Sequence, residues 1–199
     1  MEFDEIRDLD KRAVQASVTV VSHARADDLA RATPCAGWDL AELLAHMTTQ
    51  HYGFAAAAEG RGADPDVWRT RTAGDDPVHD YAKSAEVVVE AFADDSVAGR
   101  ELSLPEISTE VAFPAGQAIS FHFIDYVVHG WDVARTLGIP LVLDADVLEA
   151  GLAVAAKVPG GDRRLAPGAA FAPGVPAPDD GEPIDLIVAM LGRSPSWQR

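Results

Sequence analysis

One apolar segment, residues 121–132, carries polar side chains at helical spacing. Phe, Ile, Tyr, Val and Trp fill most of the segment, a composition typical of a buried helix. Its polar residues follow one another at intervals of three, four and three positions, which places them on one helix face: His122, Asp125, His129 and Asp132. Burying carboxylates and imidazoles on such a helix is costly unless they are paired or bind a metal. The pattern therefore predicts a polar site in the middle of a helical fold.

Apolar residues recur at helical spacing in three further long segments. The second of the predicted helices begins after Asp39, because Glu42 three residues later completes a capping box. The last of them ends at residues 138–140, where Gly-Ile-Pro is a typical stop. Residues 60–76 form a loop rich in Gly, Asp, Arg and Pro. We thus expect four main helices, over residues 3–31, 39–59, 77–95 and 117–137.

The remainder of the chain is predicted to form smaller pieces. Residues 100–114 lose the helical period and favour short extended strands. A helix at about 144–157 and a short one at 184–192 flank a Pro/Gly-rich stretch, residues 159–183, which cannot be regular helix. Apolar residues within this stretch indicate that it lies along the bundle: Leu165, Phe171 and Val175. The prediction is an all-α four-helix bundle (about 3–140) with a C-terminal extension (about 141–199), forming a single domain over residues 1–199.

Composition and motifs narrow the classes of function. The chain has 16 basic and 32 acidic residues, a net charge of −16, which disfavours binding to nucleic acid or an anionic membrane. We find no signal peptide and no apolar stretch long enough for a membrane span, so we expect a cytoplasmic protein. A single cysteine, Cys35, excludes an internal disulfide and a CxxC motif. Serine hydrolase and nucleotide-binding motifs are absent from the sequence.

Besides Asp125 and His129, a third candidate metal ligand lies on the second predicted helix. His46 stands among apolar residues, close to the face that should be buried. Asp125 and His129 are one helical turn apart, so their side chains can converge on one point. If the two helices are neighbours, these three side chains supply nitrogen and oxygen ligands and leave a coordination position open, as in catalytic zinc sites. The ligand types also suit iron(II), nickel or manganese, and do not choose among these metals.

Other interpretations of these residues stay open. Asp125 could simply accept a hydrogen bond from His129, and the whole stripe could be a hydrogen-bonded core network without metal. His122 could be a pocket wall, a fourth ligand or a core histidine. Asp132 could orient a ligand, cap a nearby backbone group or form a surface salt bridge. Trp38 could be a core anchor or a substrate contact. Two final expectations are that Cys35 is a buried, inert thiol and that three histidines are solvated: His23, His51 and His79.

Two motifs carry a resemblance to a known family. The segment TPCAGWDL at 33–40, which leads to His46, and the segment DYVVHGWD at 125–132 resemble the metal-binding domain of mycothiol-dependent maleylpyruvate isomerase, of the DinB-like superfamily of four-helix bundles. The tail, residues 171–173 and 191–195, resembles actinobacterial single-domain members described as metal-binding proteins. The resemblance covers nearly the whole chain and implies a DinB-like four-helix bundle.

The resemblance also implies a ligand set. In that family the metal, commonly zinc, is held by a His of the second helix and by an acidic residue and a His of the later one. Carried over by motif, these are His46, Asp125 and His129. The isomerase has Glu where this chain has Asp125, and its separate C-terminal domain has no counterpart in the short tail here. The resemblance therefore supports the site rather than the substrate.

The expected function follows from an open metal position. A bound cation would lower the pKa of a thiol or water, which gives a thiol transferase or a thiol-dependent isomerase acting on a small molecule. The resemblance implies mycothiol as the co-substrate in an actinobacterial host. A metal-dependent hydrolase and a non-catalytic metal-binding or ligand-binding module are the alternatives. Homodimerisation is an option for the superfamily, although the sequence shows no interface.

Overall fold

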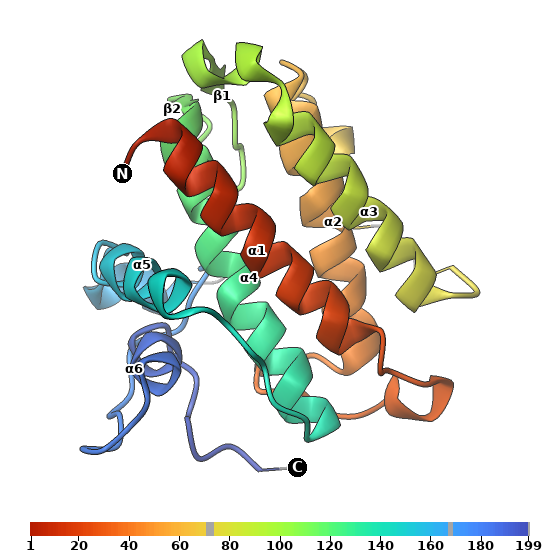
Figure 1. Cartoon of the computed structure of the whole chain (residues 1–199), viewed down its shortest axis with the longest axis vertical. Coiled ribbons are helices and arrows are strands. Elements are labelled where there is room, and N and C mark those ends of the chain that lie inside the picture. The colour runs from red at the N-terminus through yellow and green to blue at the C-terminus, as the bar shows by residue number, and fades with distance from the viewer. Residues whose placement is uncertain (71–73, 167–168, 199) are drawn as a thin grey trace.

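Four long helices form the body of the protein (Figure 1). The computed structural model describes residues 1–70, 74–166 and 169–198. Helix α1 lies along α4, and α2 lies along α3. The predicted all-α four-helix bundle is thus confirmed. The bounds of the four helices are α1 Phe3–Val21, α2 Leu40–Ala58, α3 Pro77–Ala93 and α4 Ala115–Leu137.

The predicted start and stop signals act as expected. The Asp39 side chain accepts a hydrogen bond from the backbone N–H of Glu42, and the Glu42 side chain accepts one from the backbone N–H of Asp39. This capping box satisfies two N–H groups that would otherwise lack partners at the start of α2. Helix α4 ends at Gly138, whose φ of 70° is left-handed and suits glycine. Local interactions therefore determine where α2 begins and where α4 ends, and these two helices carry the candidate ligands.

The first helix is shorter than predicted. The apolar spacing predicted helix as far as residue 31, but α1 ends at Val21 and a 3₁₀ turn, η1 (Ala26–Asp28), follows. The Asp28 carboxylate accepts a hydrogen bond from the backbone N–H of Arg25, which competes with helix continuation. Leu29 still packs on the core, so its apolar spacing reflects burial in a turn rather than helix.

Short elements link the helices. Two further 3₁₀ turns, η2 (Pro65–Trp68) and η3 (Asp95–Gly99), flank α3. The predicted extended segment supplies two short antiparallel strands, β1 (Glu101–Leu102) and β2 (Phe113–Pro114). Parts of two predicted loops, residues 71–73 and 167–168, lie outside the described residues.

The C-terminal extension contains α5 (Ala145–Ala155), the 3₁₀ turn η4 (Gly161–Leu165) and α6 (Pro183–Met190). The Arg164 guanidinium ties it together, because it donates to the carbonyls of Val158, Pro159, Ala172 and Met190. Phe171 packs against the core as predicted. Leu165 is 69% exposed and Val175 is also exposed, so the prediction is wrong for these two residues.

The interior of the bundle is mostly apolar. Ile6 and Leu9 of α1 meet Ile119 and Phe123 of α4 in one large core cluster. Burying each such side chain contributes roughly 1.5–3 kcal/mol. Within the described part of the chain, no helix is both long and apolar enough to cross a membrane.

Candidate metal centre

Three side chains from two helices meet beside the core. The Nε2 atom of His129 lies 3.3 Å from Oδ1 of Asp125, and Nε2 of His46 lies 4.0 Å from Oδ2 of the same carboxylate. One ligand atom from each residue lies within 4.8 Å of the others. The His46 and Asp125 side chains are 26% and 21% exposed, whereas that of His129 is 4% exposed. The cluster therefore opens to solvent on the side of His46 and Asp125.

A second carboxylate orients His129. The Nδ1 atom of His129 donates to Oδ2 of Asp132 over 2.9 Å, and Asp132 is fully buried. Because this bond occupies Nδ1, the ring presents Nε2 to Asp125. A carboxylate that fixes the tautomer and direction of a histidine in this way is common beside protein-bound metals.

The charges of the cluster differ sharply from residue to residue. Burial lowers the pKa of His46 to about 4, so its ring is neutral at neutral pH. Burial also acts against an imidazolium at His129, but the Asp125 and Asp132 carboxylates outweigh it and raise the pKa of His129 to about 9. Burial opposes ionisation of Asp125, yet His129 holds the pKa of Asp125 well below its usual range. The cluster thus already stabilises one positive charge between two carboxylates.

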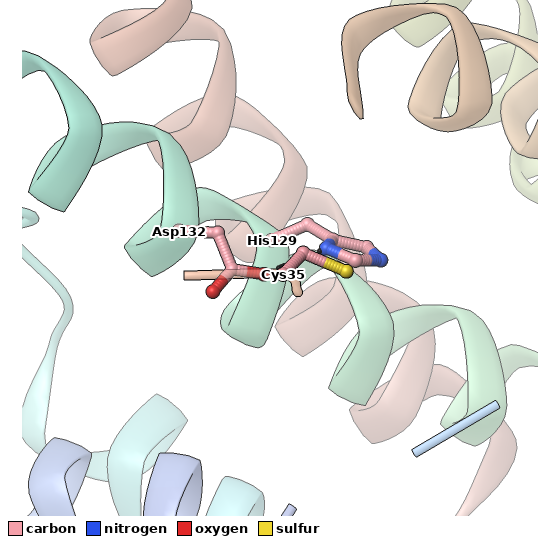
Figure 2. A group of neighbouring side chains, drawn as sticks. All are labelled: Cys35, His129 and Asp132. Atoms are coloured by element: carbon pink, nitrogen blue, oxygen red, sulfur yellow. Dashed lines mark hydrogen bonds and ion pairs between the residues drawn. The ribbon is translucent and has the colours of Figure 1, made fainter. Parts of the chain in front are cut away.

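A buried arginine, Arg193, contacts the same Asp132 carboxylate that accepts a hydrogen bond from His129. Arg193 follows α6, is 5% exposed, and donates to Oδ2 of Asp132 at 3.3 Å and to Sγ of Cys35 at 3.6 Å. Figure 2 shows the Cys35 side chain and the Asp132 carboxylate beside the His129 ring. Burial and the nearby acidic groups raise the pKa of Cys35 to about 11, although Arg193 acts in the opposite direction. Cys35 is therefore a protonated thiol at neutral pH.

Among the residues that the structure describes, two groups of side chains have ligand atoms close enough for a cation, and they share His129. One comprises His46, Asp125 and His129, and the other comprises Cys35, His129 and Asp132. The Arg193 guanidinium already contacts both Cys35 and Asp132, so a cation bound by the second group would lie next to a positive charge. The first group has an ionised carboxylate between two imidazoles whose Nε2 atoms both face it, and no guanidinium of the described residues bonds to it. The geometry therefore favours the first group.

The sequence of this chain matches a known family over the four helices. Residues 11–134 match the mycothiol maleylpyruvate isomerase N-terminal domain. The chain belongs to this family. Two uncharacterised proteins from strains of Mycobacterium tuberculosis are each 28% identical to it over 190 residues, which cover 92% of this chain and 95% of each relative.

Solved structures show the same fold. The crystal structure of mycothiol-dependent maleylpyruvate isomerase matches with a TM-score of 0.58 and 12% identity, over 78% of this chain and 70% of that one. A histidine-to-alanine mutant of the isomerase matches with a TM-score of 0.59, with the same identity and coverage. This member of the isomerase N-terminal domain family thus shares the fold of the matched part of the isomerase.

The other predicted residues lie at different distances from the cluster. The Trp38 ring contacts the His46 ring, with 4.7 Å between centroids, so Trp38 forms a wall of the site. His122 does not join the cluster: it is fully buried and bonded to Asp10 and His51. His23 and His79 are exposed as expected, but the expectation for His51 is wrong, because its side chain is fully buried. Its neighbours in the sequence, Gln50 and Tyr52, gave no sign of which helix packs against His51.

Sequence reasoning missed Arg193. It lies 61 positions after Asp132 and outside the segment that defines the family of the isomerase N-terminal domain. No local spacing links an arginine in a Pro/Gly-rich tail to a carboxylate of a distant helix. The one available signal is that Asp132, on a buried helix, needs a positive partner beyond His129.

Proposed function

We propose that this protein binds a divalent transition-metal ion through Nε2 of His46, the Asp125 carboxylate and Nε2 of His129. The observation that carries the proposal is the bond from Nδ1 of His129 to Asp132, which leaves Nε2 directed at Asp125. Separations of 3.3 and 4.0 Å between neighbouring ligand atoms suit a common cation at about 2.0–2.2 Å from each. Two nitrogens and one carboxylate fit zinc first, with nickel, iron(II) and manganese as the alternatives.

The protonation states of the three side chains support metal binding. Asp125 is ionised and His46 is neutral at neutral pH, the states in which each acts as a ligand. Only His129 must lose a proton, from Nε2, when that atom binds a cation. Asp132 keeps the proton on Nδ1 during this exchange, so the ring need not turn.

The reaction we propose is thiol-dependent chemistry on a small molecule, with mycothiol as the co-substrate. Membership of the isomerase N-terminal domain family supports this choice. A cation bound by three protein ligands would have an open position at which it lowers the pKa of a thiol or water. Asp125 and His46 form the exposed side of the cluster, so the substrate would enter there, past Trp38.

The test begins with the metal content of protein purified without an affinity tag. Inductively coupled plasma mass spectrometry should find near-stoichiometric metal in the wild type and little in His129→Ala. His79→Ala, at an exposed histidine, is the matched control and should keep the metal. No metal in the wild type after incubation with zinc, nickel, iron(II) and manganese would contradict the proposal.

Turnover assays then separate the classes of function. Consumption of mycothiol or a simpler thiol with electrophilic small molecules, lost in His129→Ala, would support an enzyme. Metal without any thiol turnover would favour a non-catalytic binding module or a hydrolase. The cytoplasmic location and the homodimer stay predictions, and light scattering of the purified protein tests the second.

A further inference from the structure

A hydrogen bond joins the two ligand-bearing helices next to the candidate ligands. The hydroxyl of Tyr126 on α4 donates to the backbone carbonyl of Met47 on α2. Tyr126 directly follows Asp125, and Met47 directly follows His46. The bond therefore links the residue after one candidate ligand to the residue after another.

The spacing between these helices depends on side chains that bridge them. Helix α1 lies along α4 and α3 along α2, whereas α2 and α4 contact each other far less. The His51 ring of α2 stacks on the Tyr126 ring of α4, with 4.0 Å between centroids and 10° between planes. Both residues are at most 1% exposed. The two stacked rings and the Tyr126 hydroxyl thus occupy the space that separates α2 from α4.

The stacked His51 and Tyr126 rings belong to a buried layer that also includes a polar side chain of a third helix, α1. Nδ1 of His51 lies 3.2 Å from Nε2 of His122, and Nδ1 of His122 donates to Oδ1 of Asp10 on α1 over 2.6 Å. Nε2 of His51 is buried and has no hydrogen-bond partner among the described residues. An apolar layer would avoid that desolvation cost. Stability alone therefore explains this layer poorly, whereas a fixed separation of α2 and α4 explains it well.

We propose that Tyr126 is a positioning residue for the metal centre. Its hydroxyl holds the turn of α2 that carries His46 at the distance from Asp125 that a shared cation needs. The inference rests on the proposed metal site, and it adds a residue that acts on the ligands without touching the cation. A ligand set held within about 0.5 Å depends on supporting contacts of this kind.

Another tyrosine in the same bundle offers a matched control. Tyr81 of α3 is as buried as Tyr126, and its hydroxyl lies 2.6 Å from the Ser17 hydroxyl of α1. Tyr126→Phe and Tyr81→Phe each remove one buried hydroxyl and keep the ring. Only the first breaks a bond between α2 and α4, so a role in stability alone would affect both variants in the same way.

Zinc affinity, measured by competition with a chromophoric chelator, tests the inference. Tyr126→Phe should weaken zinc binding about 10-fold, the usual scale for supporting contacts around a metal, and Tyr81→Phe by less than about 2-fold. The visible spectrum of bound cobalt(II), which reports coordination geometry, should change in Tyr126→Phe only. Melting curves of the metal-free proteins show that both variants are folded.

The possible failures are distinguishable. Wild-type zinc affinity and an unchanged cobalt spectrum in Tyr126→Phe would overturn the inference and leave the proposed metal site standing. Equal weakening in both variants would also overturn it, because a general loss of stability would then account for the effect. Absence of zinc and cobalt binding in the wild type would overturn the proposed function itself, and the inference with it.

Discussion

Nδ1 of His129 and Oδ2 of Asp132 lie 2.9 Å apart, one turn from each other on α4, and this bond divides the site into two sides. On one side, Nε2 of His129 faces Asp125 and the partly exposed His46. On the other, Asp132 faces Arg193 and the buried end of the C-terminal extension. A single carboxylate thus connects the candidate metal centre to a segment outside the family-defining helices.

Replacing Asp132 tests the orientation of His129. In Asp132→Asn, the amide can present either oxygen or NH₂ to Nδ1, so the ring no longer holds one tautomer. We expect zinc affinity to fall about 10- to 100-fold, with all three ligands still present. Chelator competition measures the change. Asp144→Asn, at an exposed carboxylate that pairs with Arg12, is the control and should match the wild type. Unchanged affinity in Asp132→Asn would show that Asp132 does not orient His129.

Replacing Arg193 tests the anchoring of the extension. Arg193→Gln leaves the buried Asp132 with His129 as its one charged partner among the described residues. Breaking a buried ion pair from one side costs roughly 3 kcal/mol or more, which urea unfolding of the metal-free protein measures. Arg69→Gln, at a 78% exposed side chain paired with Asp66, should stay within about 0.5 kcal/mol of the wild type. Equal stabilities of the two variants would contradict this account of Arg193.

The sequence predicts the positions of the helices better than it predicts the contacts between distant segments. Periodicity and capping located α2 and α4 within about two residues, because local hydrogen bonds and one buried face determine such helices. The convergence of Asp125 and His129 followed from helical spacing alone. The burial of His51 and the pairing of Asp132 with Arg193 did not, because each depends on which helix or tail packs against that position. Local patterns carry no information about such distant contacts.

The reactivity of Cys35 should be low. Burial raises the pKa of this thiol from 9.0 to about 11, so the thiolate fraction at neutral pH falls about 100-fold. Alkylation by iodoacetamide should accordingly be about 100-fold slower in the native protein than in urea. The native rate should rise roughly tenfold for each pH unit up to about pH 10, since the thiolate is the nucleophile. Fast native alkylation at neutral pH would show an accessible thiolate and contradict this picture.

The stability of the metal-free protein should fall in mild acid because of His51. Burial, with the nearby His122, holds the pKa of His51 well below its usual value of 6.5. Between the folded-state pKa and pH 6.5, the unfolded chain binds a proton at this residue that the folded chain does not. The contribution of His51 is therefore complete above pH 6.5 and is lost as the pH falls, by up to about 1.4 kcal/mol per pH unit.

His51→Gln isolates this contribution from those of other groups. Urea unfolding in the presence of a chelator, between pH 5 and pH 6.5, should give a shallower dependence of stability on pH for His51→Gln than for the wild type. His79→Gln, at an exposed histidine, should keep the wild-type dependence. Parallel pH profiles for His51→Gln and the wild type would mean that His51 accepts a proton in the folded state.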